Sequence, residues 1–183
     1  MNDSAPNATA DVLIVYASRH GATRGVAGHI CVRLDDAGLE PELRRVEDRR
    51  ELLPASPAVL GSPVYDQRWA PEADAFVQRR LHELAERPLW LFSVGTFGDR
   101  RRVIGRFMAR EPRGIDKVRE TTRPRDYRVF AGVIRREQWP LASRMLYHAF
   151  GGRLGDNRDW ADIDTWADGM AVALIPPVAA EAT

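Results

Sequence analysis

The sequence lacks disulfide-forming cysteines, apolar runs of bilayer length and clusters of metal ligands. Cys31 is the single cysteine, so an internal disulfide is impossible, and this usage fits a reducing compartment. No apolar run approaches the length that spans a bilayer, and residues 1–10 lack the basic and apolar segments of a secretory signal. The four histidines have no metal-ligand spacing, and no Ser/His/Asp set is visible. We therefore expect a cytoplasmic protein that holds no metal, and the sequence identifies no catalytic side chain.

The composition is that of a globular chain with one domain. Its 183 residues are 44% hydrophobic and 29% charged, which supplies enough apolar material for a core of its own. We expect residues 11–176 to form this domain, after a disordered lead-in over 1–10 and before a flexible tail over 177–183.

Charge is unevenly distributed, although the formal net charge is only +1. The stretch Arg100–Arg128, here called the basic segment, holds 11 Lys and Arg against four Asp and Glu, whereas the other residues hold 16 against 22. Such a segment attracts an anionic substrate, an anionic membrane surface or nucleic acid. Nothing in it resembles a recognition helix with base-reading side chains, so no nucleic-acid partner is expected. The plain alternative is a solvated, arginine-rich insertion.

Strand-like apolar runs alternate with helical patterns along the chain. The strands are predicted at residues 12–16, 41–46, 58–61, 89–94 and 127–134. This alternation implies right-handed crossovers, so we expect an α/β fold with a five-stranded parallel sheet in the order 2-1-3-4-5. In that topology a ligand lies beyond the carboxyl ends of the strands, where the strand order reverses.

Two further features follow from the same patterns. Residues 97–126 are too long for a plain loop and form an arginine-rich insertion before the fifth strand, with helical stretches such as 103–108. In the last helix, Trp160 and Trp166 are expected to be core anchors.

A short turn joins the first strand to the first helix. The hydroxyls of Ser18 and Thr23 are able to donate to phosphate oxygens, Gly21 lets the backbone approach closely, and the helix N-terminus favours an anion. The turn lacks the lysine of a P-loop and the glycine spacing of a dinucleotide fold, which disfavours nucleoside triphosphates and dinucleotides. An ordinary capped helix start is the alternative. The candidate phosphate-binding residues of this first loop are Ser18, Arg19, His20, Gly21, Ala22 and Thr23.

Two more segments follow the third and fourth predicted strands. Tyr65 or Trp69 could stack on a planar ring, although Trp69 packed beneath the next helix is the alternative. Two glycines after the fourth strand allow a backbone turn around a ligand, or else a flexible entry into the insertion. Because all three segments end parallel strands, the fold gathers them at one edge. The added candidate residues are Ser62, Pro63, Val64, Tyr65, Val94, Gly95, Thr96, Phe97 and Gly98.

These motifs, in the order S-x-x-G-x-T, LGSPVYDQRW and PLWLFSVGTFGD, resemble the flavodoxin-domain proteins that bind FMN. The resemblance covers about residues 12–174. It is closer to the branch that contains menaquinone-dependent protoporphyrinogen dehydrogenase. The residues that carry this narrower resemblance are Gly61–Tyr65, the arginine-rich insertion, Phe130–Gly132 and Arg158–Trp160.

The resemblance implies a flavodoxin-like three-layer sandwich with FMN at the carboxyl edge of the sheet. Ser18–Thr23 would hold the FMN phosphate, while Ser62–Tyr65 and Gly95–Gly98 would flank the isoalloxazine. Val133–Arg135, at the end of the fifth strand, would also face the flavin.

Three functions remain open at this stage. The first is an FMN-dependent oxidoreductase that passes electrons from an organic small-molecule substrate to a quinone or another redox partner. The second is a flavodoxin-type electron shuttle, and the third is a flavin-free interaction module. Shuttle flavodoxins usually surround the flavin edge with acidic residues, whereas the basic segment suits an anionic substrate or peripheral contact with the inner membrane face. These considerations favour the oxidoreductase.

Overall fold

A computed structural model describes residues 11–50, 52, 56–95, 111–134 and 155–175. Its main sheet has the strand order β2-β1-β3-β5-β6, with every pair on this path parallel. These are the five strands predicted from the sequence, in the predicted order, so the α/β sandwich is confirmed. The strands span β1 Asp11–Tyr16, β2 Glu40–Arg45, β3 Ala58–Tyr65, β5 Leu89–Gly95 and β6 Asp126–Ala131.

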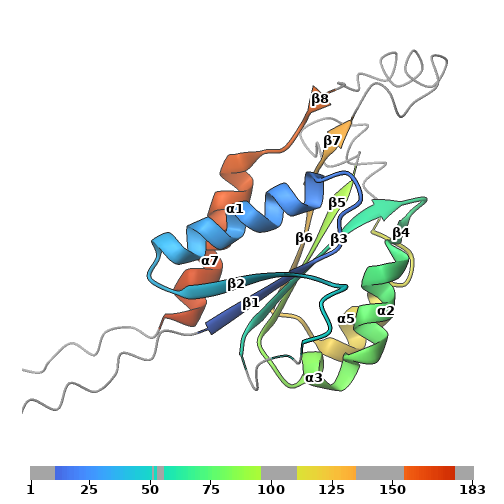
Figure 1. The fold of residues 1–183 in the computed structure, drawn as a ribbon, viewed down its shortest axis with the longest axis horizontal. Coiled ribbons are helices and arrows are strands. Elements are labelled where there is room, and N and C mark those ends of the chain that lie inside the picture. Colours follow the sequence, from blue (N-terminus) through green and yellow to red (C-terminus); the bar gives the residue numbers. More distant parts are fainter. Residues whose placement is uncertain (1–10, 51, 53–55, 96–110, 135–154, 176–183) are drawn as a thin grey trace, which may run out of the picture.

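Helices cover both faces of the sheet, which gives three layers (Figure 1). Alternate residues of β1 show the arrangement, because Val12 and Ile14 belong to one apolar cluster and Leu13 and Val15 to the other. The first cluster includes α1 and α7, and the second includes α2, α3 and α5. The helices span α1 Ala22–Asp36, α2 Pro71–Arg79, α3 Leu81–Ala85, α5 Ile115–Thr122 and α7 Trp160–Leu174.

Local sequence explains where several helices begin and end. Gly38 adopts φ 88° just after α1, the left-handed conformation that stops a helix. Pro71 stands in the first turn of α2, where its missing N–H costs nothing. The Asp159 carboxylate accepts from the Asp162 N–H and caps α7. None of the helices in the described ranges is both long enough and apolar enough to cross a bilayer.

The third strand is longer than its sequence predicts. Pairing with β5 continues through Pro63, and the chain then reverses at Asp66 and Gln67 into β4, Arg68–Trp69. Both turn residues have positive φ, at 48° and 62°, as a two-residue hairpin requires. Gly61, which resembles a turn signal in the sequence, lies inside the strand. The position requires glycine because an added Cβ would overlap the Phe92 ring.

The predicted fifth strand, residues 127–134, ends earlier, at Ala131, and its last two residues belong to a second, two-stranded sheet that the sequence does not predict. β7, Val133–Ile134, pairs antiparallel with β8, Gly155–Asp156, and this pairing leads the chain into α7. The prediction for Trp160 was wrong: its exposed fraction is 37%, whereas Trp166 is buried as expected. The predicted lead-in, the tail and the helical stretch 103–108 lie outside the described residues.

Candidate functional site

The carboxyl ends of β1, β3 and β5 meet at one edge of the sheet (Figure 1). The Ala17 N–H donates to the Gly61 carbonyl at 3.0 Å, which joins the end of β1 to β3. Pro63 is paired with Val94 in the next strand, and the Gly132 N–H donates to the Gly95 carbonyl at 2.8 Å. The fold therefore brings together the first loop, the end of β3 and the end of β5. Thr96, Phe97 and Gly98 lie outside the described residues.

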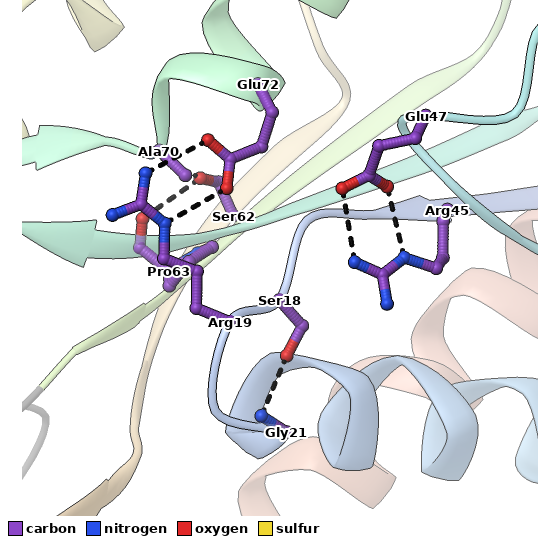
Figure 2. A network of polar contacts seen from close by, with 9 residues as sticks. All are labelled: Ser18, Arg19, Gly21, Arg45, Glu47, Ser62, Pro63, Ala70 and Glu72. Carbon is purple, nitrogen blue, oxygen red and sulfur yellow. Dashed lines mark hydrogen bonds and ion pairs between the residues drawn. The ribbon is translucent and has the colours of Figure 1, made fainter.

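The first loop is held in shape by a serine hydroxyl. Ser18 Oγ accepts from the Gly21 N–H at 3.1 Å (Figure 2). It also accepts from the Arg24 N–H at 3.4 Å. Gly21 is the N-cap residue of α1 and has φ 87°, a conformation that glycine adopts without strain. Because Ser18 accepts both bonds through its oxygen, its own O–H is still available to donate to an anion.

Donors are available at the N-terminus of α1. In the described part of the chain, nothing accepts from the backbone N–H groups of Ala22 and Thr23. The Thr23 side chain is 1% exposed, and no described group bonds its hydroxyl. The Thr23 hydroxyl therefore reaches the surface of an otherwise buried side chain, where it can donate to a ligand.

The charge at this helix end is also unusual for the chain. The first turn of α1 contains no acidic residue, whereas the first turns of the other described helices contain Glu72 and Asp74, Glu83, Asp116 or Asp162. Carboxylates at those positions complement the positive end of the helix dipole. The first turn of α1 has no carboxylate of its own in that position, so an anion bound there would be stabilised.

An arginine joins the first loop to the next segment of the site. Arg19 Nε and Nη2 donate to Glu72 Oε1 and Oε2, at 3.2 and 3.3 Å, as Figure 2 shows. The Arg19 guanidinium also lies 5.5 Å from the ring centroid of Tyr65, and the His20 ring meets Tyr65 edge-on at 6.3 Å. The hydrogen bonds from Arg19 lower the pKa of Glu72, while burial raises the pKa of Tyr65.

The β3 segment divides into a buried part and a surface part. Ser62 is fully buried; its Oγ accepts from the Ala70 N–H at 3.0 Å and donates to the Pro63 carbonyl at 3.0 Å. These bonds fix the hairpin from inside the protein. Val64 and Tyr65 are half-buried and are the residues of this segment that can face a ligand.

Trp69 has a structural position. It is 4% exposed, and its indole N–H donates to Ser93 Oγ at 2.7 Å, while Ser93 and Tyr127 share a second hydrogen bond of 2.8 Å. Val94 is also buried, whereas Gly95 is half-buried at the end of β5. Trp69 therefore packs beneath the edge rather than stacking on a ligand.

Sequence reasoning missed three charged residues near the first loop, Glu72, Arg45 and Glu47. Glu72 is the partner of Arg19, and its place beside Pro71 in a first helical turn was the available signal. The other two form an ion pair at the end of β2, where Arg45, the last residue of the strand, pairs with Glu47 (Figure 2). The Val46 N–H, which donates to the Tyr16 carbonyl at 3.0 Å, holds that pair beside the end of β1.

Comparison with known proteins identifies relatives of this fold. The family described as flavodoxin domain matches residues 13–150. A flavodoxin from the domain Archaea is similar in structure, with a TM-score of 0.59 and 14% identity over 90% of this chain and 98% of that one. Flavodoxin 1 of Bacillus cereus has a TM-score of 0.56 and 13% identity, over 91% and 99%.

A larger protein contains a similar unit. The flavo-diiron protein of Thermotoga maritima has a TM-score of 0.59 and 14% identity over 91% of this chain, which spans 36% of that protein. A search of curated proteins finds no match. At these identities the structural likeness establishes the fold alone.

Proposed function

Because the chain belongs to the flavodoxin domain family, we propose that it binds FMN at the carboxyl edge of its sheet and works as a redox protein. The observation that carries this proposal is the N-terminus of α1. It combines two backbone N–H groups, of Ala22 and Thr23, that no described group accepts from, the accessible Thr23 hydroxyl and a first turn without any carboxylate. A phosphate monoester fits those donors and that charge.

Different residues would contact the phosphate and the ring of FMN. Ser18, Ala22 and Thr23 would hold the phosphate, with Gly21 allowing close approach. Val64, Tyr65 and Gly95 would lie against the ring system, and Tyr65 offers a half-buried aromatic face for stacking. FMN, when bound, supplies the redox chemistry of its ring, while the protein positions it and sets the surrounding charge.

The Arg19–Glu72 ion pair adds no net charge to the site, but it holds the first loop in one conformation. Their hydrogen bonds hold the first loop against α2, and the guanidinium rests over Tyr65. A loop fixed before the ligand arrives loses less conformational entropy on binding.

We further propose that the reaction is an oxidoreduction of an organic anionic substrate, such as a porphyrinogen, with a quinone as acceptor. The basic segment supports this reading, since it lies beside the β3–β4 turn, where the Arg113 N–H donates to the Gln67 carbonyl at 2.6 Å. Near the first loop, the ion pairs Arg19–Glu72 and Arg45–Glu47 balance in charge. An electron shuttle would instead present an excess of carboxylates to its partner around the flavin edge. The arginines of the basic segment would also support contact with an anionic membrane surface that carries quinone.

The cofactor proposal is tested on the purified chain. Yellow protein with absorbance maxima at about 375 and about 450 nm, or colourless protein that regains them with FMN, supports it. Colourless protein that FMN does not reconstitute would refute it and favour an interaction module.

The reaction is tested by anaerobic reduction of the FMN-loaded protein with candidate donors, followed by reoxidation with quinones. Complete two-electron exchange with an organic donor and a quinone supports the oxidoreductase. Exchange of single electrons with protein partners alone would support the shuttle instead.

A further inference from the structure

Arg158 lies against the first helix although it is distant in sequence. It precedes α7, and its side chain is only 17% exposed. The Asp156 carboxylate accepts from Arg158 Nε at 2.8 Å and from Nη2 at 2.5 Å. The guanidinium also lies 4.3 Å from the ring centroid of Trp160. The side chain is therefore held on two sides, by a carboxylate and by an aromatic face.

The remaining nitrogen of Arg158 is directed at α1. Nη1 occupies the space where a Cβ of Gly25 would be, so that any larger residue at position 25 would overlap it. Among the described residues, Nη1 has no hydrogen-bond acceptor. A Cβ in a helix points toward the N-terminus, so this position lies over the turn that begins at Gly21 and Ala22.

The place is unfavourable for a cation, even though the Asp156 carboxylate pairs with Arg158. A guanidinium beside the N-terminal turn of a helix opposes the helix dipole, and Arg24 adds a second positive charge to the same turn. Gly25 adds a further cost, because glycine is a poorer helix former than alanine. Both features become favourable if the space serves to place a cation beside a bound phosphate.

We propose that Arg158 is part of the phosphate site and provides the cation that faces the anion held on the first turn of α1. This inference rests on the proposed function, because FMN is the phosphate ligand that it invokes. Asp156 and Trp160 fix the direction of the guanidinium, and Gly25 leaves room for Nη1. The ligand group recognised is a phosphate monoester rather than the ring.

The first test compares FMN with riboflavin, which lacks the phosphate. Arg158→Gln should weaken FMN binding about tenfold, the order expected when one positive charge near a partly solvated phosphate is lost, and should leave riboflavin binding unchanged. Arg33→Gln is the matched control, since Arg33 also pairs α1 with α7, but through Asp168 and in the last turn of α1. Equal losses for both flavins would show that Arg158 only holds the fold together and would overturn the proposal.

The second test leaves the charge in place and removes its space. Gly25→Ala should displace Nη1 and weaken FMN binding in the same direction, and it should have no further effect on FMN binding when combined with Arg158→Gln. Unchanged FMN affinity in Gly25→Ala alone would contradict the proposal.

A third test separates this inference from the proposed function. Inorganic phosphate should raise the Tm of the wild-type chain more than that of Arg158→Gln. If this difference is found while no flavin binds, the FMN proposal fails and the assignment of Arg158 stands. If phosphate stabilises both proteins equally, the assignment fails whatever the flavin result.

Discussion

Replacing Arg24 with Glu should stabilise the free protein and weaken its binding of FMN. Arg24 is an exposed residue in the first turn of α1, and only its backbone N–H contacts the loop, through Ser18 Oγ. A carboxylate there complements the helix dipole, whereas the native arginine opposes it. Since each charge is worth about 0.3–1 kcal/mol, the exchange should add about 1 kcal/mol to the free energy of unfolding. For a chain of this size, the Tm should rise by about 3 °C.

The same substitution acts in the opposite direction on the complex. The FMN phosphate carries about two negative charges near neutral pH. Two unit charges separated by about 7 Å in water interact with about 0.6 kcal/mol. At such a separation, the change of two units in the side chain against about two charges on the phosphate costs about 2.4 kcal/mol of binding, or about 60-fold in Kd at low salt.

The assay is a pair of measurements on the same protein. Thermal unfolding without flavin gives the stability change, and quenching of flavin fluorescence gives the Kd for FMN and for riboflavin. Arg24→Gln should show about half of each effect. The reasoning is refuted if Arg24→Glu binds FMN as tightly as the wild type, or if riboflavin binding falls by the same factor.

Three further predictions concern the supporting structure. Ser62→Ala should lower the free energy of unfolding by about 1 kcal/mol, because Ser62 Oγ accepts from the buried Ala70 N–H. FMN affinity should not change, and a lower affinity at constant Tm would indicate direct contact with the flavin. Gln67→Gly should raise the urea midpoint, with a gain of about 1 kcal/mol, because Gln67 has φ 62° in the turn; a lower midpoint would contradict the hairpin. Arg19→Gln should raise the pKa of Glu72, whose folded value is now lowered by Arg19, as measured by NMR titration. Because the folded pKa lies below the unfolded one, the stability from this pair is present at neutral pH and is lost as the pH falls below about 4, so an advantage of the wild type over Arg19→Gln that persisted at pH 2 would refute the assignment.

The sheet order and the first loop were predictable because their signals are local. Apolar runs and helical periods identify the strands and helices, and handedness rules then leave few ways to arrange them. The start of α1 follows from Gly21 and its neighbours, which lie within a few residues of one another in the sequence. Both the confirmed strand order and the position of the first loop rest on such short-range patterns.

The features that sequence reasoning missed depend on contacts between distant residues. Gly61 resembles a turn glycine, but it is required by Phe92 in the neighbouring strand. Trp160 resembles a core residue, yet it lies on the surface beneath Arg158 and 4.7 Å from the His29 ring. The pairing of β7 with β8 joins segments about twenty residues apart, with no turn signal to set its register. None of these contacts has a periodic pattern that a single sequence could reveal.

The most direct test of the phosphate site is an NMR titration of the backbone amides of the wild-type chain with FMN and, separately, with riboflavin. The Ala22 and Thr23 amide signals should move downfield with FMN, because their N–H groups gain a phosphate acceptor, and should move little with riboflavin. The Tyr65 and Gly95 signals should respond to both flavins. FMN saturation that leaves the Ala22 and Thr23 signals in place would contradict the account.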